Sequence, residues 1–188
     1  SEGDRLHTQY LVAGLSGPVV PGLSYKAYGI ASLVEETDKD PVLTGAASLD
    51  MTWLPPGEAP DRVYGQVRWA SGQKSDTEGS PFLPVTANPQ GAIFDPRLAG
   101  LLAVRGGYAV RLSGKVSLDA SAGTFLKMGE GRPFTYNGLA ATPTSAWLGA
   151  EAFASARYMP ASDLALSLGA GIFVPNAGGA FDAGTDPS

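Results

Sequence analysis

Residues 98–127 read LAGLLAVRGGYAVRLSGKVSLDASAGTFLK, two runs in which apolar and polar side chains alternate. Neighbouring side chains of a β-strand point to opposite faces, so an alternation with period two predicts two strands. The Ser and Gly of residues 113–115 reverse a chain at little conformational cost and predict a hairpin turn between them. The apolar side of the first run, opposite Arg105 and Arg111, consists of Leu98, Leu102, Val104, Tyr108, Val110 and Leu112.

The same alternation recurs along the whole chain and predicts about eight antiparallel strands. Each is long for a strand of a water-soluble protein and close to the roughly 9 to 11 residues of a tilted strand that crosses a bilayer. The predicted strands cover residues 6–16, 23–34, 42–54, 62–70, 98–112, 116–127, 145–158 and 164–174. In the strand over 145–158, the apolar side consists of Leu148, Ala150, Ala152, Ala154 and Ala156, opposite Glu151, Ser155 and Arg157.

Short and long connections between these strands alternate strictly. Gly, Pro, Ser and Asp fill the short ones and predict tight turns, so the long ones all fall at one end of the sheet. This asymmetry is typical of the up-and-down meander of a membrane β-barrel, and we predict an all-β fold with one barrel domain or barrel segment over residues 1–188. The short turns are residues 17–22, 55–61, 113–115 and 159–163, and the long connections are residues 35–41, 71–97, 128–144 and 175–188.

The composition of the 188 residues also favours a barrel wall. Charged residues make up only 16% of the chain, against roughly 25% in soluble proteins, and 25 glycines suit a closely spaced, curved sheet. The absence of cysteine excludes a disulfide scaffold and a thiolate metal site. The longest uncharged stretches, residues 6–25 and 164–181, are interrupted by Gly and Pro and alternate, so neither predicts a transmembrane helix.

Alternation alone does not separate a membrane barrel from a soluble β-sandwich, because each strand of a sandwich also has one apolar and one polar face. Strand length and loop asymmetry favour the barrel. Aromatic residues favour it too, because Tyr25, Trp53 and Tyr158 fall beside short turns on the apolar face and Trp69 falls near a long loop. Tyr and Trp prefer the headgroup level on both sides of a bilayer. We therefore predict a transmembrane β-barrel of the bacterial outer membrane, in contact with the lipid bilayer and lipopolysaccharide.

The charged side chains of the predicted strands lie opposite the apolar ones, and cations outnumber carboxylates there. The chain as a whole has a net charge of -5 because most of its carboxylates fall in the connections. Aligned cations in a low-dielectric wall favour anions, so the pattern predicts a cationic lumen for anionic solutes. The alternative is that these cations pair with the lumen carboxylates and hold a narrow barrel together. The predicted pore-lining residues are Lys26, Asp50, Arg68, Arg105, Arg111, Asp119, Lys127, Glu151 and Arg157.

The connection over residues 71–97 is too long for a plain link in a compact domain. Prolines stiffen it, and Phe82, Leu83, Ile93 and Phe94 are candidates for anchoring it against a barrel wall. Two alternatives stay open for this connection. It either folds into or over the mouth of the barrel and sets the constriction, or it forms a surface loop.

The sequence contains none of the common enzymatic motifs. His7 is the only histidine, and no G-x-S-x-G, P-loop, G-x-G-x-x-G or H-E-x-x-H pattern occurs. The acidic residues of the segment 35–40 could ligate Ca²⁺, but they lack the glycine-spaced loop of a known site and are better interpreted as a solvated loop. The acidic total and the lack of a basic, aromatic patch disfavour nucleic-acid binding. We predict no catalysis, no cofactor and no metal.

The last predicted hairpin carries a family resemblance. Residues 148–181 read LGAEAFASARYMPASDLALSLGAGIFVPNAGGAF, in which an LGxE strand leads through a short turn into an SLxxG strand. This order resembles the closing part of alginate-export-type bacterial outer-membrane barrels. The resemblance implies a passive conduit for an anionic polysaccharide or smaller anions, with Arg and Lys lining the pore and Glu151 and Arg157 in the wall. The chain departs from the family at residues 174–176, where the family has an aromatic-Pro-Gly loop, and no terminal strand ending in an aromatic residue follows.

The first predicted strand begins, and the last one ends, on the long-loop side, whereas an outer-membrane barrel normally begins and ends on the short-turn side. We therefore expect an eight-strand part of a larger barrel, completed by strands from another segment or chain. The predicted function is that of a porin-like channel segment for transport. One alternative is a soluble all-β module, structural or carbohydrate-binding through Trp53, Trp69 and Trp147. The other is a non-conducting scaffold barrel in a cell-envelope assembly.

Overall fold

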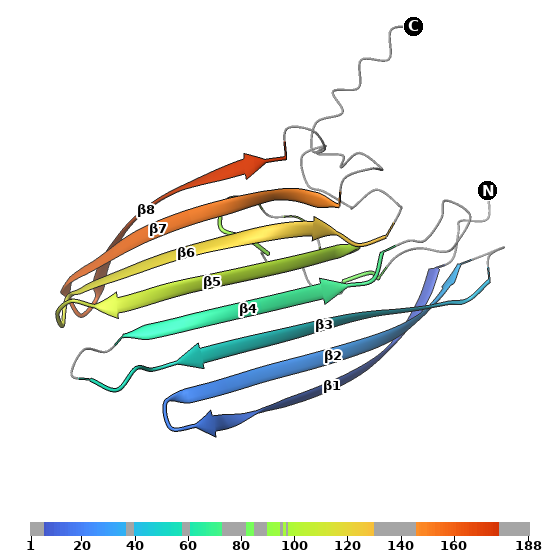
Figure 1. The fold of residues 1–188 in the computed structure, drawn as a ribbon, viewed down its shortest axis with the longest axis horizontal. Coiled ribbons are helices and arrows are strands. Elements are labelled where there is room, and N and C mark those ends of the chain that lie inside the picture. Colours follow the sequence, from blue (N-terminus) through green and yellow to red (C-terminus); the bar gives the residue numbers. More distant parts are fainter. Residues whose placement is uncertain are drawn as a thin grey trace, which may run out of the picture.

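The computed structural model describes residues 6–36, 40–57, 61–72, 82–84, 90–94, 96, 98–129 and 146–176. Over these residues the chain is all-β and forms one curved sheet (Figure 1). Its strands are β1 Leu6–Val20, β2 Leu23–Glu36, β3 Val42–Trp53, β4 Arg62–Ala70, β5 Leu101–Arg111, β6 Val116–Lys127, β7 Trp147–Ala161 and β8 Leu164–Pro175.

The strands pair in chain order, each antiparallel to the next, which confirms the predicted eight-strand meander. Within the described residues, β1 pairs with β2 alone and β8 pairs with β7 alone. The sheet is therefore open, with a free edge on β1 and another on β8. A closed transmembrane barrel stays a prediction.

Three strand boundaries differ by three or more residues from those expected. β1 runs on to Val20, and the chain reverses only at residues 21–22, where Gly22 has a φ of 82° that suits a residue without a Cβ. β7 likewise continues to Ala161, so its turn is shorter than predicted. β5 begins at Leu101, three residues later than expected. Residues 17–20 and 159–161, which their Gly and Pro content predicts as parts of turns, therefore belong to strands.

The register defines two faces of the sheet. Direct cross-strand partners link Lys26 to Asp50, Asp50 to Gln66 and Gln66 to Arg105. We call this side the inner face; it carries the even-numbered residues of β1 over 8–18, of β2 over 24–34, of β3 and of β4, and the odd-numbered residues of β5, β6, β8 and of β7 over 149–157. The opposite side, the outer face, carries mostly Leu, Val and Ala. The separation of charged from apolar side chains agrees with the predicted alternation.

The described parts of the connection between β4 and β5 lie against the inner face and are visible behind the sheet in Figure 1. Phe82 packs with Ala46 and Ala70, and Phe94 packs with Leu101 and other residues of β5–β7. These clusters form the hydrophobic core of the described chain. The described residues of this connection thus fold against the inner face, as the first alternative requires, and a constriction at a barrel mouth stays a prediction.

Leu148 and Leu98 lie on the inner side, so their predicted placement on the apolar face is wrong. A bulge between Phe125 and Leu126 breaks the β6–β7 register, and Gly149 beside it has a φ of 148°. The bulge re-aims Leu148, which is buried in the cluster around Phe125. Leu98 precedes β5 and packs against both inner clusters. Strict alternation cannot anticipate a bulge, because the extra residue reverses the side to which the next side chains point.

An aromatic ring lies across a glycine on the inner face. Tyr64 of β4 passes over Gly107 of β5 and donates its hydroxyl hydrogen to Asp119 of β6, at 3.0 and 3.2 Å from the two carboxylate oxygens. A Cβ at residue 107 would lie 2.2 Å from Cζ of this ring. Glycine therefore leaves the space through which one side chain ties three neighbouring strands together.

We expect Gly107→Ala to displace the Tyr64 ring and break its bond to Asp119. A hydrogen bond to a charged group contributes about 1.5–3 kcal/mol, and the free energy of unfolding in a urea titration should fall by that amount. Gly106→Ala is the matched control, because a Cβ there meets its nearest atom at 3.8 Å and both changes affect the unfolded chain alike. Tyr64→Phe should cost as much as Gly107→Ala, and the double variant no more than either. Additive losses would contradict this account.

Candidate functional site

All the predicted pore-lining residues lie on the inner face. The structure brings them onto one surface, and their role in lining a pore stays a prediction. Their exposure depends on position along the strands. Lys127 and Glu151 are buried at 7% and 4% exposure, Lys26, Arg111 and Arg157 are exposed, and Asp50, Arg68, Arg105 and Asp119 are half-buried.

The carboxylates of the inner face accept hydrogen bonds from neutral donors. The side-chain amide of Gln66 donates to Asp50, and the hydroxyl of Tyr64 donates to Asp119. Glu151 accepts from backbone amides. None of these bonds uses an Arg or Lys side chain. Lys26 lies directly opposite Asp50 on the neighbouring strand, so the alternative in which the cations pair with these carboxylates and hold a narrow barrel together stays a prediction.

Glu151 anchors the β4–β5 connection to the wall. Its Oε1 accepts a hydrogen bond from the N–H of Ala92 at 2.8 Å, and its Oε2 accepts from the N–H of Ile93 at 3.0 Å and of Phe94 at 3.1 Å. Gly91 allows this approach, because a Cβ there would lie 2.7 Å from the carboxylate. A buried carboxylate that accepts several amide donors is a strong, charge-assisted contact.

Aromatic packing holds the same connection on the β5–β8 half of the sheet. The ring of Phe94 stacks on Phe173 of β8 with centroids 4.5 Å apart, and meets Phe125 of β6 edge-on at 5.0 Å. Phe125 is 2% exposed, so these rings fill the inner face there. We call this group of Phe94, Phe125 and Phe173 the aromatic cluster. It leaves the open part of the inner face on the side of β1–β4.

Arg105 adds positive charge to the middle of the inner face, and Arg62 adds it at the short-turn end of β4. Nη2 of Arg105 donates to Oγ of Ser121 at 2.8 Å, while its buried Nε has no hydrogen-bond partner among the described residues. The guanidinium carbon of Arg62 lies 5.3 Å from the centroid of the Tyr64 ring. Sequence reasoning left out Arg62, the first residue of β4. Its even position, two residues before Tyr64, is the signal that assigns it to this face.

Three adjoining hollows run along the inner face of β1–β5, and Asp50 lines all of them. The first, of about 570 Å³, lies beneath Phe82 and is lined by Lys26 and Arg68. The second, of about 370 Å³, is lined by Arg68 and Arg105. The third, of about 640 Å³, extends from Lys26 towards the short turns. We call this series of three hollows the polar track.

The outer face is apolar and uncovered by other described parts of the chain. Leu11, Leu43 and Leu168 are 74%, 76% and 78% exposed. Glu35, at the long-loop end of β2, is the one charged residue at the outer-face positions of the described strands. A soluble monomer rarely exposes a contiguous apolar patch larger than a few hundred Å². Such a face marks contact with a membrane or with another protein.

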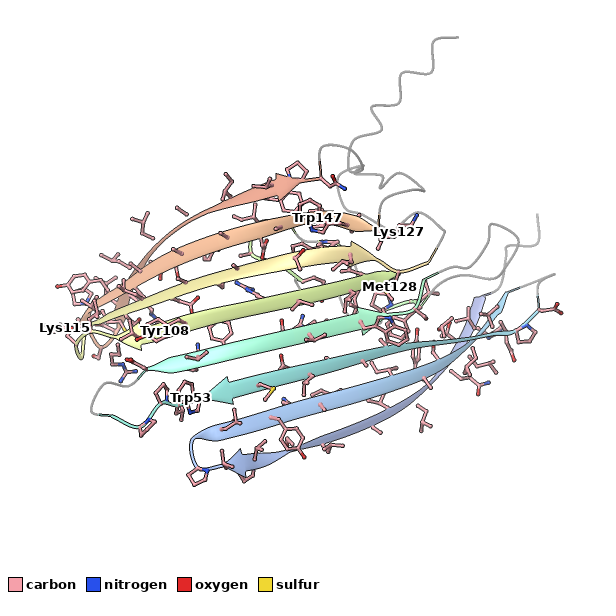
Figure 2. The ribbon with its side chains drawn as sticks, viewed as in Figure 1. Trp53, Tyr108, Lys115, Lys127, Met128 and Trp147 are labelled. Atoms are coloured by element: carbon pink, nitrogen blue, oxygen red, sulfur yellow. The ribbon has the colours of Figure 1, made fainter. Side chains whose placement is uncertain are left out.

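The tryptophans lie far apart on the outer face. Figure 2 shows Trp53, together with Tyr108, towards the short-turn end of the sheet and Trp147 at the opposite end. Trp69 is on the strand next to that of Trp53, but it pairs with Ala47, six residues or roughly 20 Å further along β3. The three indoles do not form one stacking platform, so the carbohydrate-binding alternative gains no support from them.

Neither a helical membrane span nor a metal cluster is found in the described part of the chain. No helix there is long and apolar enough to cross a membrane. Groups of three or more His, Cys, Asp or Glu side chains that could hold a metal ion are also absent from it. Residues 37–39 of the acidic segment lie outside the described residues, and His7 is exposed on β1.

Comparisons with known proteins assign no family to the chain. No protein-family model matches it, and a search of curated proteins finds no match. The resemblance of residues 148–181 to alginate-export-type barrels has no support from these comparisons and stays a prediction. Its part beyond residue 176 lies outside the described residues.

We expect Glu151→Gln to release the β4–β5 connection from the wall, because an amide nitrogen would then face backbone N–H donors. The loss of a charge-assisted bond should lower the free energy of unfolding by about 1.5–3 kcal/mol. Hydrogen exchange at Ala92, Ile93 and Phe94 should accelerate. Glu35→Gln, which removes the same charge from an exposed site, should change stability by less than about 0.5 kcal/mol. Unchanged exchange at residues 92–94 would rule out the anchoring role.

Proposed function

We propose that the chain is part of the wall of a bacterial outer-membrane β-barrel, a porin-like channel that passes anionic solutes or polysaccharide without catalysis. One observation carries the proposal: the same eight strands combine an apolar, uncovered outer face with a cationic inner face. In this arrangement, lipid and lipopolysaccharide contact the outer face. Anions move along the polar track on the inner face.

The exposure of β8 favours lipid over water as the surroundings of the outer face. Leu164, Leu166, Leu168 and Ile172 are all about half exposed or more. Burying such a side chain contributes about 1.5–3 kcal/mol, so a single sheet in water forgoes this gain on every strand. A soluble β-sandwich obtains it from a second sheet, and the described residues form only one. Lipid hydrocarbon buries the whole face without a second layer.

The contents of the inner face support a larger barrel, completed by strands from another segment or chain. An eight-stranded barrel encloses little more than its own inward side chains. Here the inner face also holds Phe82, which meets Tyr10 of β1 edge-on, and Phe94, which stacks on Phe173 of β8. Further antiparallel strands on the edges of β1 and β8 would satisfy backbone groups that are costly to leave unpaired in lipid.

A charge placed on the outer face tests the surroundings of the sheet. Ala154 is exposed in the middle of β7, and Ala161 is exposed at its short-turn end. For a sheet in lipid, Ala154→Arg should cost about 2–4 kcal/mol of folding free energy in phospholipid vesicles, and the matched Ala161→Arg about 0–1 kcal/mol. For a sheet in water, both changes should stay within about 0.5 kcal/mol. Equal, small costs would therefore reject the membrane wall.

Ion selectivity tests the cationic inner face. Reversal potentials of the reconstituted channel in a salt gradient should report a preference for chloride over potassium. Replacing Arg105 and Arg111 together by Glu should reduce that preference several-fold. Lys115→Glu makes the same kind of charge change in the turn after β5, away from the inner face, and should leave selectivity nearly unchanged. A cation-selective channel that does not respond to the Arg105 and Arg111 changes would exclude an anion pathway.

A further inference from the structure

The hollow beneath Phe82, about 570 Å³ in volume, has the size and composition of a small-molecule site. Ligand sites in proteins typically measure about 300–1,000 Å³ and combine apolar walls with a few placed polar groups. This hollow is bounded by the inner face of β1–β4 on one side and by Phe82, Pro84 and Gln90 on the other. The inward fold of the β4–β5 connection therefore creates it.

One wall of this hollow is aromatic and held in place. The hydroxyl of Tyr10 donates to the carbonyl oxygen of Leu83 at 2.8 Å, and its ring meets that of Phe82 at 84° with centroids 6.4 Å apart. The ring of Tyr28 lies over Gly14, where a Cβ would be only 2.5 Å from it. These positioned rings offer a flat apolar surface, to which the face of a ring-shaped ligand is complementary.

The other wall carries charge. Lys26 and Arg68 contribute cations and Asp50 a carboxylate, and the carboxylate already accepts a hydrogen bond from Gln66. Nζ of Lys26 lies 5.1 Å from the centroid of the Tyr28 ring, next to the aromatic wall. Nη1 of Arg68 donates to Oε1 of Gln90 at 3.3 Å, which holds this guanidinium at the rim of the hollow beneath the connection. Two cationic side chains thus lie beside an apolar surface. An anionic group attached to a ring matches both walls at once.

We propose that this hollow binds ring-bearing organic carboxylates, with the carboxylate towards Lys26 and Arg68 and the ring against Tyr10, Tyr28 and Phe82. The hollow is the end of the polar track that lies beneath the β4–β5 connection, so its role in transport rests on the proposed function. Binding in the hollow then allows the channel to distinguish ring-bearing carboxylates from other anions. Binding itself depends only on the residues of the two walls.

Isothermal titration of the full-length protein in detergent with three probes separates the two walls. Benzoate carries both features, benzamide lacks the charge, and acetate lacks the ring. We expect saturable binding of benzoate, and binding of the other two at least about tenfold weaker, which corresponds to about 1.4 kcal/mol. Equal binding of benzoate and benzamide, or no binding of benzoate, would overturn the proposal.

Variants locate the site. Lys26→Gln should weaken benzoate about tenfold, because it removes a charge-assisted contact. Arg157→Gln is the charge-matched control; it removes the same charge from the inner face outside this hollow and should leave the affinity unchanged. Phe82→Leu, which keeps an apolar side chain beneath the connection, should weaken benzoate and leave acetate unaffected. Equal losses in Lys26→Gln and Arg157→Gln would mean that only net charge matters and would refute the site.

Channel currents distinguish this inference from the proposed function. Benzoate should reduce the chloride current of the reconstituted channel at concentrations that saturate binding, and Lys26→Gln should shift that block about tenfold. A current without any block or binding by benzoate would overturn the inference and leave the channel proposal standing. Binding with the expected variant pattern in a protein that passes no current would support the inference and overturn the channel.

Discussion

The contact of the Glu151 carboxylate with three consecutive backbone amides, Ala92 to Phe94, is the interaction on which the inner face depends. It holds the β4–β5 connection against the wall and places Phe94 between Phe125 and Phe173. The aromatic cluster then fills the β5–β8 half, so the hollows lie along β1–β5. The sequence pattern predicts that Glu151 lines a pore. In the structure, Glu151 holds the connection that fills the β5–β8 half of the inner face, and so determines where the open hollows lie.

The same contact bears on how the sheet can be completed. With Phe82 against β1 and Phe94 against β8, the two edge strands face a space that already holds a folded connection. Direct pairing of β1 with β8 would have to enclose this connection within eight strands, whose interior holds little beyond side chains. The free edges of β1 and β8 and the connection packed on the inner face therefore both favour completion of the sheet by further strands over closure with eight.

The features of the fold that depend on neighbouring residues in the sequence were predictable. Burial of one face per strand imposes a period of two, so the sides of Arg105 and Val104 follow from the sequence alone. The side on which Leu148 lies does not follow from the sequence, because a bulge at Gly149 reverses the alternation. Nor does the role of Glu151, because its amide partners lie 57–59 residues away in the chain. Contacts between distant segments decide which inner-face charges are covered and which line the hollows.

The exposed apolar side chains of the outer face limit most strongly which surroundings suit the chain. The face is apolar from the short turns almost to the long-loop end, where Glu35 lies, and Leu168 and Leu43 remain more than 70% exposed. A protein partner would ordinarily meet an apolar centre bordered by a polar rim, with hydrogen bonds spread over the patch. This face instead forms a uniform band across eight strands, with Trp53 and Trp147 towards its two ends (Figure 2). A band of that form matches a slab of hydrocarbon between two headgroup layers better than it matches a discrete partner surface.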